Sequence, residues 1–283
     1  MKRSLPAWTL AALAGLGLVA GCTGGGGTST TPAPKASRSA GPAAPGSSPV
    51  AGAPASPTVA PAATPLSPRQ SPPAVLAAAL AALKDGPAVH VGISATTSQG
   101  AITFSDDANA RGGRQLITTS YGGSVTILFI AGVGYVQGNA VGLVGLDEVP
   151  QSQAQSEAGR WISISPGEEL GQDSYDDVVD GITLSSVASE LSITGPLTLT
   201  GPTTVAGQSA IAVQGRAPAS MQLPATARVT LYVSASDARP LRYEVSGVSG
   251  YQNQITFSDW GEKLTLATPS GAVPASGGTP IVT

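Results

Sequence analysis

The chain has 283 residues, of which 41% are hydrophobic, 11% charged and 4% aromatic, and its formal net charge is −3. Such a chain offers no basic surface for nucleic acid, because binding to phosphates depends on Lys and Arg that displace counterions. The 36 Gly and 24 Pro favour many short strands and turns beside a segment that does not fold. The residues outside this unfolded segment are numerous enough for one domain with its own core.

The N-terminal residues have the pattern of an export signal. Lys2 and Arg3 precede an uncharged stretch from residue 5 to residue 19. This stretch is shorter than the roughly 17–25 apolar residues that a membrane-spanning helix needs. It leads into the motif VAGC, which ends at Cys22 and resembles the lipobox of bacterial lipoproteins. The resemblance implies that residues 1–21 are a lipoprotein signal peptide and that Cys22 carries acyl chains such as palmitate.

Cys22 is the only cysteine, so the chain cannot form an internal disulfide. The alternative to lipidation is a free thiol or an intermolecular bridge. Each buried methylene of an acyl chain adds about 0.8 kcal/mol to membrane affinity, and two or three chains make the attachment stable. The sequence therefore predicts a protein anchored through Cys22 to the outer, extracytoplasmic face of the cell membrane.

Residues 22–73 are predicted to form a disordered tether behind the lipidated cysteine. They are rich in Gly, then Thr and Ser, then Pro and Ala, without hydrophobic periodicity. This composition buries too little apolar surface to offset the entropy of ordering. The alternatives for the tether are a spacer, a glycosylated stalk, and an insertion without a selected length. Residues 269–283 are predicted to be a second disordered segment.

The segment 74–268 is predicted to be the folded domain. It begins with a helix in which Ser71 is the cap, prolines occupy the first turn and Gly86 ends the run AVLAAALAALK. Short turns at Gln99-Gly100, Gly112-Gly113 and Gly122-Gly123 separate the first strands. Strands with alternating apolar residues are predicted at 88–98, 101–110, 114–120, 125–130, 133–137, 160–165, 197–200, 209–215, 227–234, 241–249 and 252–258.

The strand 124–130 is apolar on both faces, which indicates that both are covered. The segment 167–191 has apolar residues at helical spacing and is predicted to supply two short helices as the cover. The segment 139–158 is ambiguous. The sequence therefore predicts the α+β class, with one large antiparallel sheet and helices on one of its faces.

The sequence offers little for catalysis or metal binding. His90 is the only histidine, lies on the first strand, and is interpreted as a sheet-face residue rather than a catalytic base. Asp106 and Asp107 are interpreted as turn or surface acids. A group of acids shares one face if the segment is helical, and is interpreted as a solvated face rather than a Ca²⁺ site: Asp173, Asp176, Asp177 and Asp180. We expect no enzyme, no metal and no cofactor.

A series of short motifs recurs in a familiar order behind the lipobox. They are AVHV at 88–91, GYV at 134–136, GRWI at 159–162, TVAGQ at 204–208, RPLR at 239–242 and FSDWG at 257–261. Together they resemble the actinobacterial LppX/LprAFG lipoprotein family, over most of residues 73–269. The resemblance implies an antiparallel half-barrel similar to LolA and LolB, with helices over the concave face. It also implies an apolar cavity for the acyl chains of lipids or glycolipids, which such proteins carry or present across the cell envelope.

The leading functional prediction is therefore a monomeric, membrane-anchored lipoprotein whose ligands are acyl chains. The predicted cavity lining is Ile93, Phe104, Ile127, Phe129, Val136, Ile162, Val179, Ile182, Val187 and Leu191. The competing interpretation is that these residues form an ordinary filled core. The protein would then be a surface-displayed interaction or structural lipoprotein without a lipid ligand.

Overall fold

The computed structural model describes residues 66, 69–97, 100–146, 149–171 and 173–275, which all belong to one compact unit of the chain. The signal peptide, Cys22 and the tether up to residue 65 lie outside the described residues, so the statements about them stay predictions. Among the described residues, no helix combines the length and the hydropathy needed to cross a membrane.

Most of the described chain is one large sheet. Its strands are β1 (Val89–Thr97), β2 (Gly100–Asn109), β3 (Gly112–Thr119), β4 (Ser124–Ile130), β5 (Val133–Gly138), β6 (Ile162–Ile164), β9 (Thr194–Val205), β10 (Gln208–Arg216), β11 (Arg228–Ser234), β12 (Pro240–Ser246), β13 (Gln252–Ser258) and β14 (Val273–Pro274). The order across the sheet is β14-β6-β5-β4-β3-β2-β1-β13-β12-β11-β10-β9. The sheet is open, with β14 at one end and β9 at the other, and all neighbours are antiparallel except β14 and β6.

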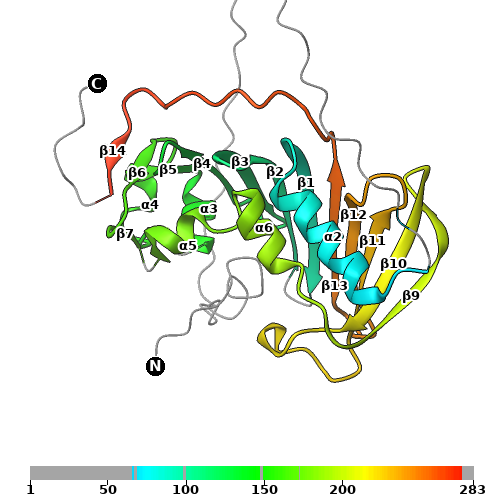
Figure 1. Ribbon diagram of the computed structural model, residues 1–283. Helices are drawn as coiled ribbons and strands as arrows, with labels where there is room; N and C mark the ends of the chain where they lie inside the picture. Colours follow the sequence, from blue (N-terminus) through cyan, green and yellow to red (C-terminus); the bar gives the residue numbers. More distant parts are fainter. Residues whose placement is uncertain (1–65, 67–68, 98–99, 147–148, 172, 276–283) are drawn as a thin grey trace, which may run out of the picture. The chain divides into compact units, whose positions relative to one another are not determined.

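The helices are α2 (Pro72–Lys84), α3 (Ala140–Gly145), α4 (Ala154–Glu157), α5 (Tyr175–Val179) and α6 (Leu184–Glu190), and Ala219–Met221 forms one 3₁₀ turn. A small hairpin, β7 (Glu169–Leu170) with β8 (Asp173–Ser174), precedes α5. Figure 1 shows the sheet bending around α2, α3, α5 and α6, which lie on one of its sides. The predicted α+β class and the arrangement of helices over one face of an antiparallel sheet are thus confirmed.

The longest helix, α2, forms where the sequence predicts it. Val75, Ala79 and Leu83 follow the i, i+4, i+8 spacing of one helix face and are fully buried. Ser71 is the N-cap residue, but its side chain makes no capping hydrogen bond, so the helix begins on the prolines that follow. The buried face of α2 packs on α6 and on strands β9–β12.

The two predicted short helices are α5 and α6, and each begins with a capping box. In α5, the Ser174 hydroxyl accepts from the N–H of Asp177, whose carboxylate accepts from the N–H of Ser174. In α6, Thr183 and Ser186 make the equivalent pair. The ambiguous segment after β5 supplies α3 and α4, with the Asn139 side chain capping α3.

The buried apolar residues form two clusters between the sheet and the helices. The first cluster joins α2 and α6 to β1 and β10–β13 and includes Val75, Leu83, Val91, Ile93, Val187, Leu191, Leu231 and Tyr243. The second cluster joins α3, α5 and the loop before α6 to β3–β6 and includes Ile117, Val125, Ile127, Val136, Leu143, Ile162, Val178 and Ile182. We call the side of the sheet that carries both clusters the concave face.

The predicted turn at Gly112-Gly113 is wrong, because both glycines lie inside β3. The hairpin turns at Ala110 and Arg111 instead, where the Asn109 side chain accepts from the backbone N–H groups of Arg111 and Gly112. A Cβ on Gly113 would lie 2.5 Å from the carbonyl oxygen of Ile182. Gly113 therefore marks a close approach of the α5–α6 loop to the sheet. The turn at Gly122-Gly123 is confirmed.

Within the segment predicted to be disordered from residue 269, residues 273–275 pair with the sheet. β14 pairs in parallel with β6, and the Val273 and Ala275 N–H groups donate to the carbonyls of Trp161 and Ser163 at 2.9 and 2.8 Å. These backbone bonds stabilise a strand whose side chains carry no strand pattern. Residues 276–283 lie outside the described part of the chain.

Candidate functional site

The concave face is built from the alternate residues of each strand. Successive residues of a strand point to opposite faces, and register partners point to the same face. One row across the sheet therefore runs from Val125 on β4 through Ile117, Phe104 and Ile93 to Ile255 on β13. The face that meets the helices is apolar along this whole row.

The structure places the ten predicted lining residues at this interface. The first cluster holds Ile93, Val187 and Leu191, and the second holds Ile127, Val136, Ile162 and Ile182. Phe129 packs against the second cluster. Val179 is half-buried and lies next to Gly134 of β5. Their role in lining a lipid cavity stays a prediction, since they pack against other side chains.

Phe104 connects the two clusters. Its half-buried ring packs against both of them, from the middle of β2. The cover above this part of the sheet is short: α6 has seven residues and α5 has five. Isolated helices below about 12–15 residues are marginal in water, so both depend on packing against the sheet.

A pocket of about 440 Å³ lies where β1 and β12 end and β13 begins. Its lining includes Thr96 of β1, Val245 of the first cluster, and Tyr251 and Gln252 at the start of β13. None of the ten predicted residues lines it. It nevertheless adjoins the first cluster, because Tyr251 packs against that cluster and Val245 belongs to it.

Asp106 and Gln115 interrupt the concave face, although the sequence predicts a turn or surface position for Asp106 and no special role for Gln115. Asp106 is 0% exposed, and neither of its carboxyl oxygens has a hydrogen-bond partner among the described residues. Gln115, its register partner on β3, is 5% exposed. Asp106 is therefore not a surface acid. The sequence does indicate this burial, because strand alternation places Asp106 on the same face as Phe104 and Ala108.

Burial raises the pKa of Asp106 well above its usual value, and neighbouring Asp107 raises it further. The Gln115 side chain opposes this rise in pKa. Burial therefore favours the neutral carboxyl, which has an O–H to donate as well as an oxygen to accept.

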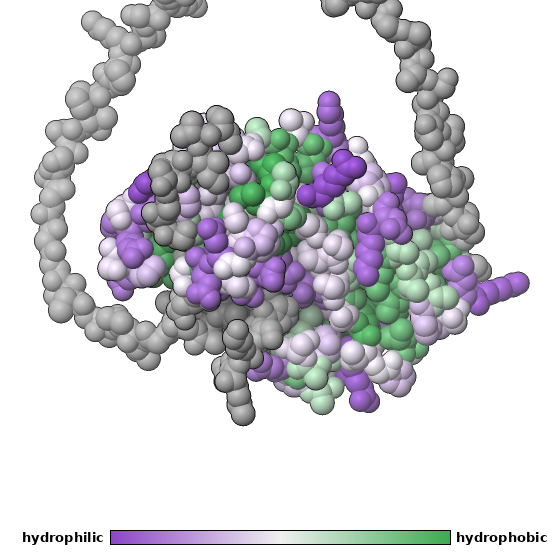
Figure 2. Space-filling view, turned by 60° about the vertical axis from the view of Figure 1, so that its left-hand side comes forward, coloured by the Kyte–Doolittle hydropathy of each residue, from purple (hydrophilic) through white to green (hydrophobic). Residues whose placement is uncertain are grey.

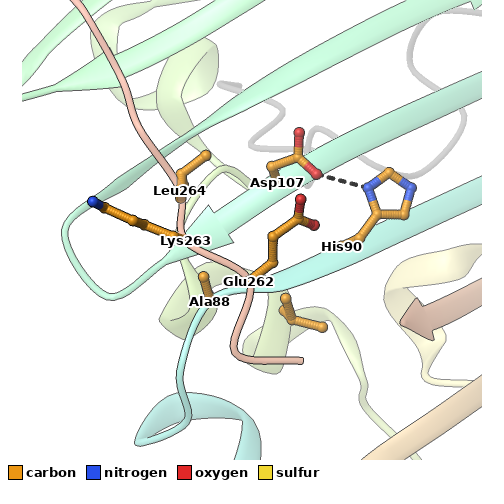
Figure 3. A pocket seen from close by; sticks show the side chains of 7 residues that line it. Ala88, His90, Asp107, Glu262, Lys263 and Leu264 are labelled. Carbon is orange, nitrogen blue, oxygen red and sulfur yellow. Dashed lines mark hydrogen bonds and ion pairs between the residues drawn. The ribbon is translucent and has the colours of Figure 1, made fainter. Parts of the chain in front are cut away.

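His90 and Asp107 lie on the opposite face from Asp106. The Nδ1 atom of His90 is 2.7 Å from a carboxylate oxygen of Asp107, beside a pocket of about 60 Å³ (Figure 3). Figure 3 shows the Glu262 side chain pointing toward this pair and that of Lys263 pointing away. Ser258 is the register partner of His90, but its hydroxyl donates to Asp259. This arrangement lacks the serine-to-histidine hydrogen bond that activates a nucleophile.

The four acids of the segment 173–180 do not share one helix face. Asp173 lies in β8, Asp177 closes the capping box of α5 and Asp180 is the C-cap residue. Within the described ranges, no group of His, Cys, Asp and Glu has a geometry suited to a metal ion.

The surface carries apolar residues in separate areas. In the view of Figure 2, hydrophobic residues come to the outside at the top and on the right, with hydrophilic residues between them. Val141 of α3 and Tyr121 in the β3–β4 turn are large hydrophobic residues with 47% and 43% exposure.

These features define an α+β protein with an open antiparallel sheet whose apolar concave face is covered by short helices. No family model and no curated protein matches the sequence. Among solved structures, the chain is similar to the lipoprotein LppX of Mycobacterium tuberculosis, with 18% identity, a TM-score of 0.44 and coverage of 70% of this chain and 100% of that one. It is also similar to LprF from Mycobacterium bovis, with 16% identity, a TM-score of 0.43 and coverage of 74% and 100%.

A LolA superfamily protein from Nitrosomonas europaea is a more distant match, with 11% identity, a TM-score of 0.27 and coverage of 70% of this chain and 96% of that one. LppX and LprF both belong to the group of lipoproteins that the sequence motifs resemble. Structures of this group are thus among those similar to the chain.

Proposed function

We propose that the protein is a membrane-anchored lipoprotein that binds acyl chains of lipids or glycolipids on its concave face, for carriage or presentation across the cell envelope. The observation that carries the proposal is the apolar row from Val125 to Ile255, which continues across both clusters beneath short helices. The lipobox ending at Cys22 supports the anchor, and the order of the sequence motifs supports the ligand class.

Binding on this face is driven by the removal of the acyl chain from water. Each Å² of apolar surface that is buried contributes about 25 cal/mol. An acyl chain needs space, so α6 and the loop before it move outward, and contacts to the lipid replace those to Ile182 and Val187. The pocket beside Tyr251 adjoins the first cluster and is the proposed mouth of the site.

The test is to purify the full-length protein from bacterial membranes in mild detergent and compare its mass under native and denaturing conditions. Covalent acyl chains on Cys22 remain in both spectra, whereas a lipid on the concave face is lost on denaturation. The proposal predicts a lipid-sized mass difference between the two spectra. Equal masses would reject it.

The packing also favours a second candidate function. Nine of the ten predicted residues belong to or pack against the two clusters, as expected for the core of a structural or interaction module. In that case the native spectrum contains the anchored protein alone, and exchange against lipid vesicles adds no further mass.

A further inference from the structure

Asp106 is placed where a carboxyl group is costly. Burying a polar group without a hydrogen bond typically costs about 1–3 kcal/mol in proteins. Both oxygens of Asp106 are buried without a hydrogen bond of regular geometry among the described residues, and the Gln115 side chain on β3 is the group that interacts with this carboxyl. A buried polar group of this kind calls for a physical reason.

The surroundings of Asp106 place it at the boundary of the two apolar clusters. In its row of register partners, Val91 on one side belongs to the first cluster, and Ile127 beyond Gln115 belongs to the second. The next row contains Phe104, which packs against both clusters. The polar pair of Asp106 and Gln115 therefore lies between the two apolar clusters, and Phe104 in the next row contacts both of them.

The α5–α6 loop covers this part of the sheet. The carbonyl oxygen of Ile182 lies so close to Gly113, the neighbour of Gln115 along the same face of β3, that no Cβ fits there. Gly181, in the same loop, has a φ of 77°. In the outward movement proposed for acyl-chain binding, this loop leaves Gly113, and the proposal is that Asp106 and Gln115, which lie beside Gly113 on the same face, become accessible.

Both side chains can donate hydrogen bonds at the same time. Burial favours the neutral carboxyl of Asp106, which has one O–H, and the Gln115 amide has two N–H groups. Two donors on register partners of neighbouring strands suit a group that only accepts. The acceptor-only group found at the head of an esterified acyl chain is the ester carbonyl.

We propose that Asp106 and Gln115 form a polar subsite within the acyl-chain site and donate hydrogen bonds to an ester carbonyl of the bound lipid. This inference rests on the proposed function. With the carbonyl held between the clusters, an acyl chain extends over one of them. The subsite makes the protein select esterified lipids over hydrocarbon chains of equal length.

The experiment is a competition between two lipids with matched chains, 1,2-dipalmitoylglycerol and its ether analogue 1,2-di-O-hexadecylglycerol, which lacks both carbonyls. The full-length protein in detergent is exchanged against equal amounts of the two, and native mass spectrometry gives the ratio bound. A neutral hydrogen bond corresponds to an ester preference of about 3- to 10-fold. Asp106→Leu should reduce the preference to about 1, whereas Asp106→Asn, which keeps an N–H donor, should retain most of it.

Gln115→Leu tests the second donor independently and should lower the preference in part. Thr230→Val is the matched control, because Thr230 is a buried polar residue whose parity on β11 places it on the other face of the sheet. Its variant should bind the two lipids in the wild-type ratio. Circular dichroism confirms that each variant folds.

The outcomes separate this inference from the function on which it rests. Equal binding of ester and ether by the wild type would overturn the subsite and leave acyl-chain binding intact. An unchanged preference in both Asp106→Leu and Gln115→Leu would also overturn it, and would assign the polar pair to the packing of the two clusters alone. Binding of neither lipid would overturn the subsite together with the proposed function.

Discussion

Two adjacent acids show how a strand divides its residues between different environments. Asp106 faces the helices and is fully buried, whereas Asp107 faces the other way and pairs with His90. The sequence predicts the strand that contains them, and strand alternation then assigns each to a face. It cannot show that, among the described residues, Asp106 makes no hydrogen bond of regular geometry, because this depends on which side chains the fold brings close to β2.

Glu190, at the end of α6, has a pKa that burial and the charge of Asp180 raise from 4.5 to about 7. The unfolded chain releases this proton near pH 4.5, but the folded protein keeps it until about pH 7. The free energy of unfolding therefore decreases as the pH rises across this window. Glu190 in turn helps to raise the pKa of Tyr243, which is raised mainly by burial.

Replacing Glu190→Gln should therefore stabilise the protein above the window and have little effect below it. Glu190 is only partly buried, so solvent screening limits the gain to about 1 kcal/mol at pH 8.5. Urea denaturation at pH 4.5 and pH 8.5 measures the difference. Glu262→Gln, at an exposed position, is the control. A gain of equal size at both pH values would show that the charge of Glu190 is not responsible.

The short helix α6 is the element on which binding depends most directly. Val187 lies on its buried face, 3% exposed, against the first cluster. Val187→Phe fills space that an acyl chain would need, so the amount of bound lipid should fall several-fold. Overpacking should lower the free energy of unfolding by about 1–3 kcal/mol. Native mass spectrometry and urea denaturation measure the two effects.

Two further variants separate loss of binding from loss of stability. Val179→Phe places the same bulk at a half-buried position on α5 and should reduce bound lipid with a smaller loss of stability. Val141→Phe makes the same change at an exposed site on α3 and should alter neither. If Val187→Phe binds as much lipid as Val141→Phe, α6 does not border the site.

Elements with strong local signals were predictable, and those that depend on distant contacts were not. The apolar spacing of α2 and the alternation of β1 are encoded in their own residues. β14 is two residues long and exists because its backbone pairs with β6, more than a hundred residues earlier. A pair of glycines is typical of a turn, but the pair at the start of β3 lies within the strand. Gly113 allows the backbone of Ile182 to come close to the sheet.

At the scale of the whole molecule, attachment to the membrane depends on Cys22, in the part of the chain outside the described residues. The acidic domain offers no electrostatic alternative for binding an anionic membrane. Cys22→Ala should therefore release the protein from the membrane fraction. Fractionation followed by immunoblotting measures this, with Ser47→Ala in the tether as control. Equal membrane retention of the two variants would contradict a lipid anchor.

The sheet with helices on one face follows from the order and patterns of the strands, and so do the ten residues at their interface. An acyl chain enters that interface only if the free energy of moving α6 is small enough, and this free energy cannot be deduced from the pattern of residues. The lipobox and the domain together predict a tethered lipid-binding protein. The lipobox indicates how the protein is attached, and the strand patterns indicate which face binds the lipid. Neither describes how α6 moves to admit it.

The most direct test of acyl-chain binding on the concave face is photo-crosslinking with a dipalmitoylglycerol analogue that carries a diazirine in the middle of one chain. After irradiation of the full-length protein, peptide mapping locates the labelled residues. The account predicts labels on β1, β2 and β4 at positions such as Ile93, Phe104 and Ile127, and on α6. Labels confined to the opposite face, or no label above that of a denatured control, would contradict it.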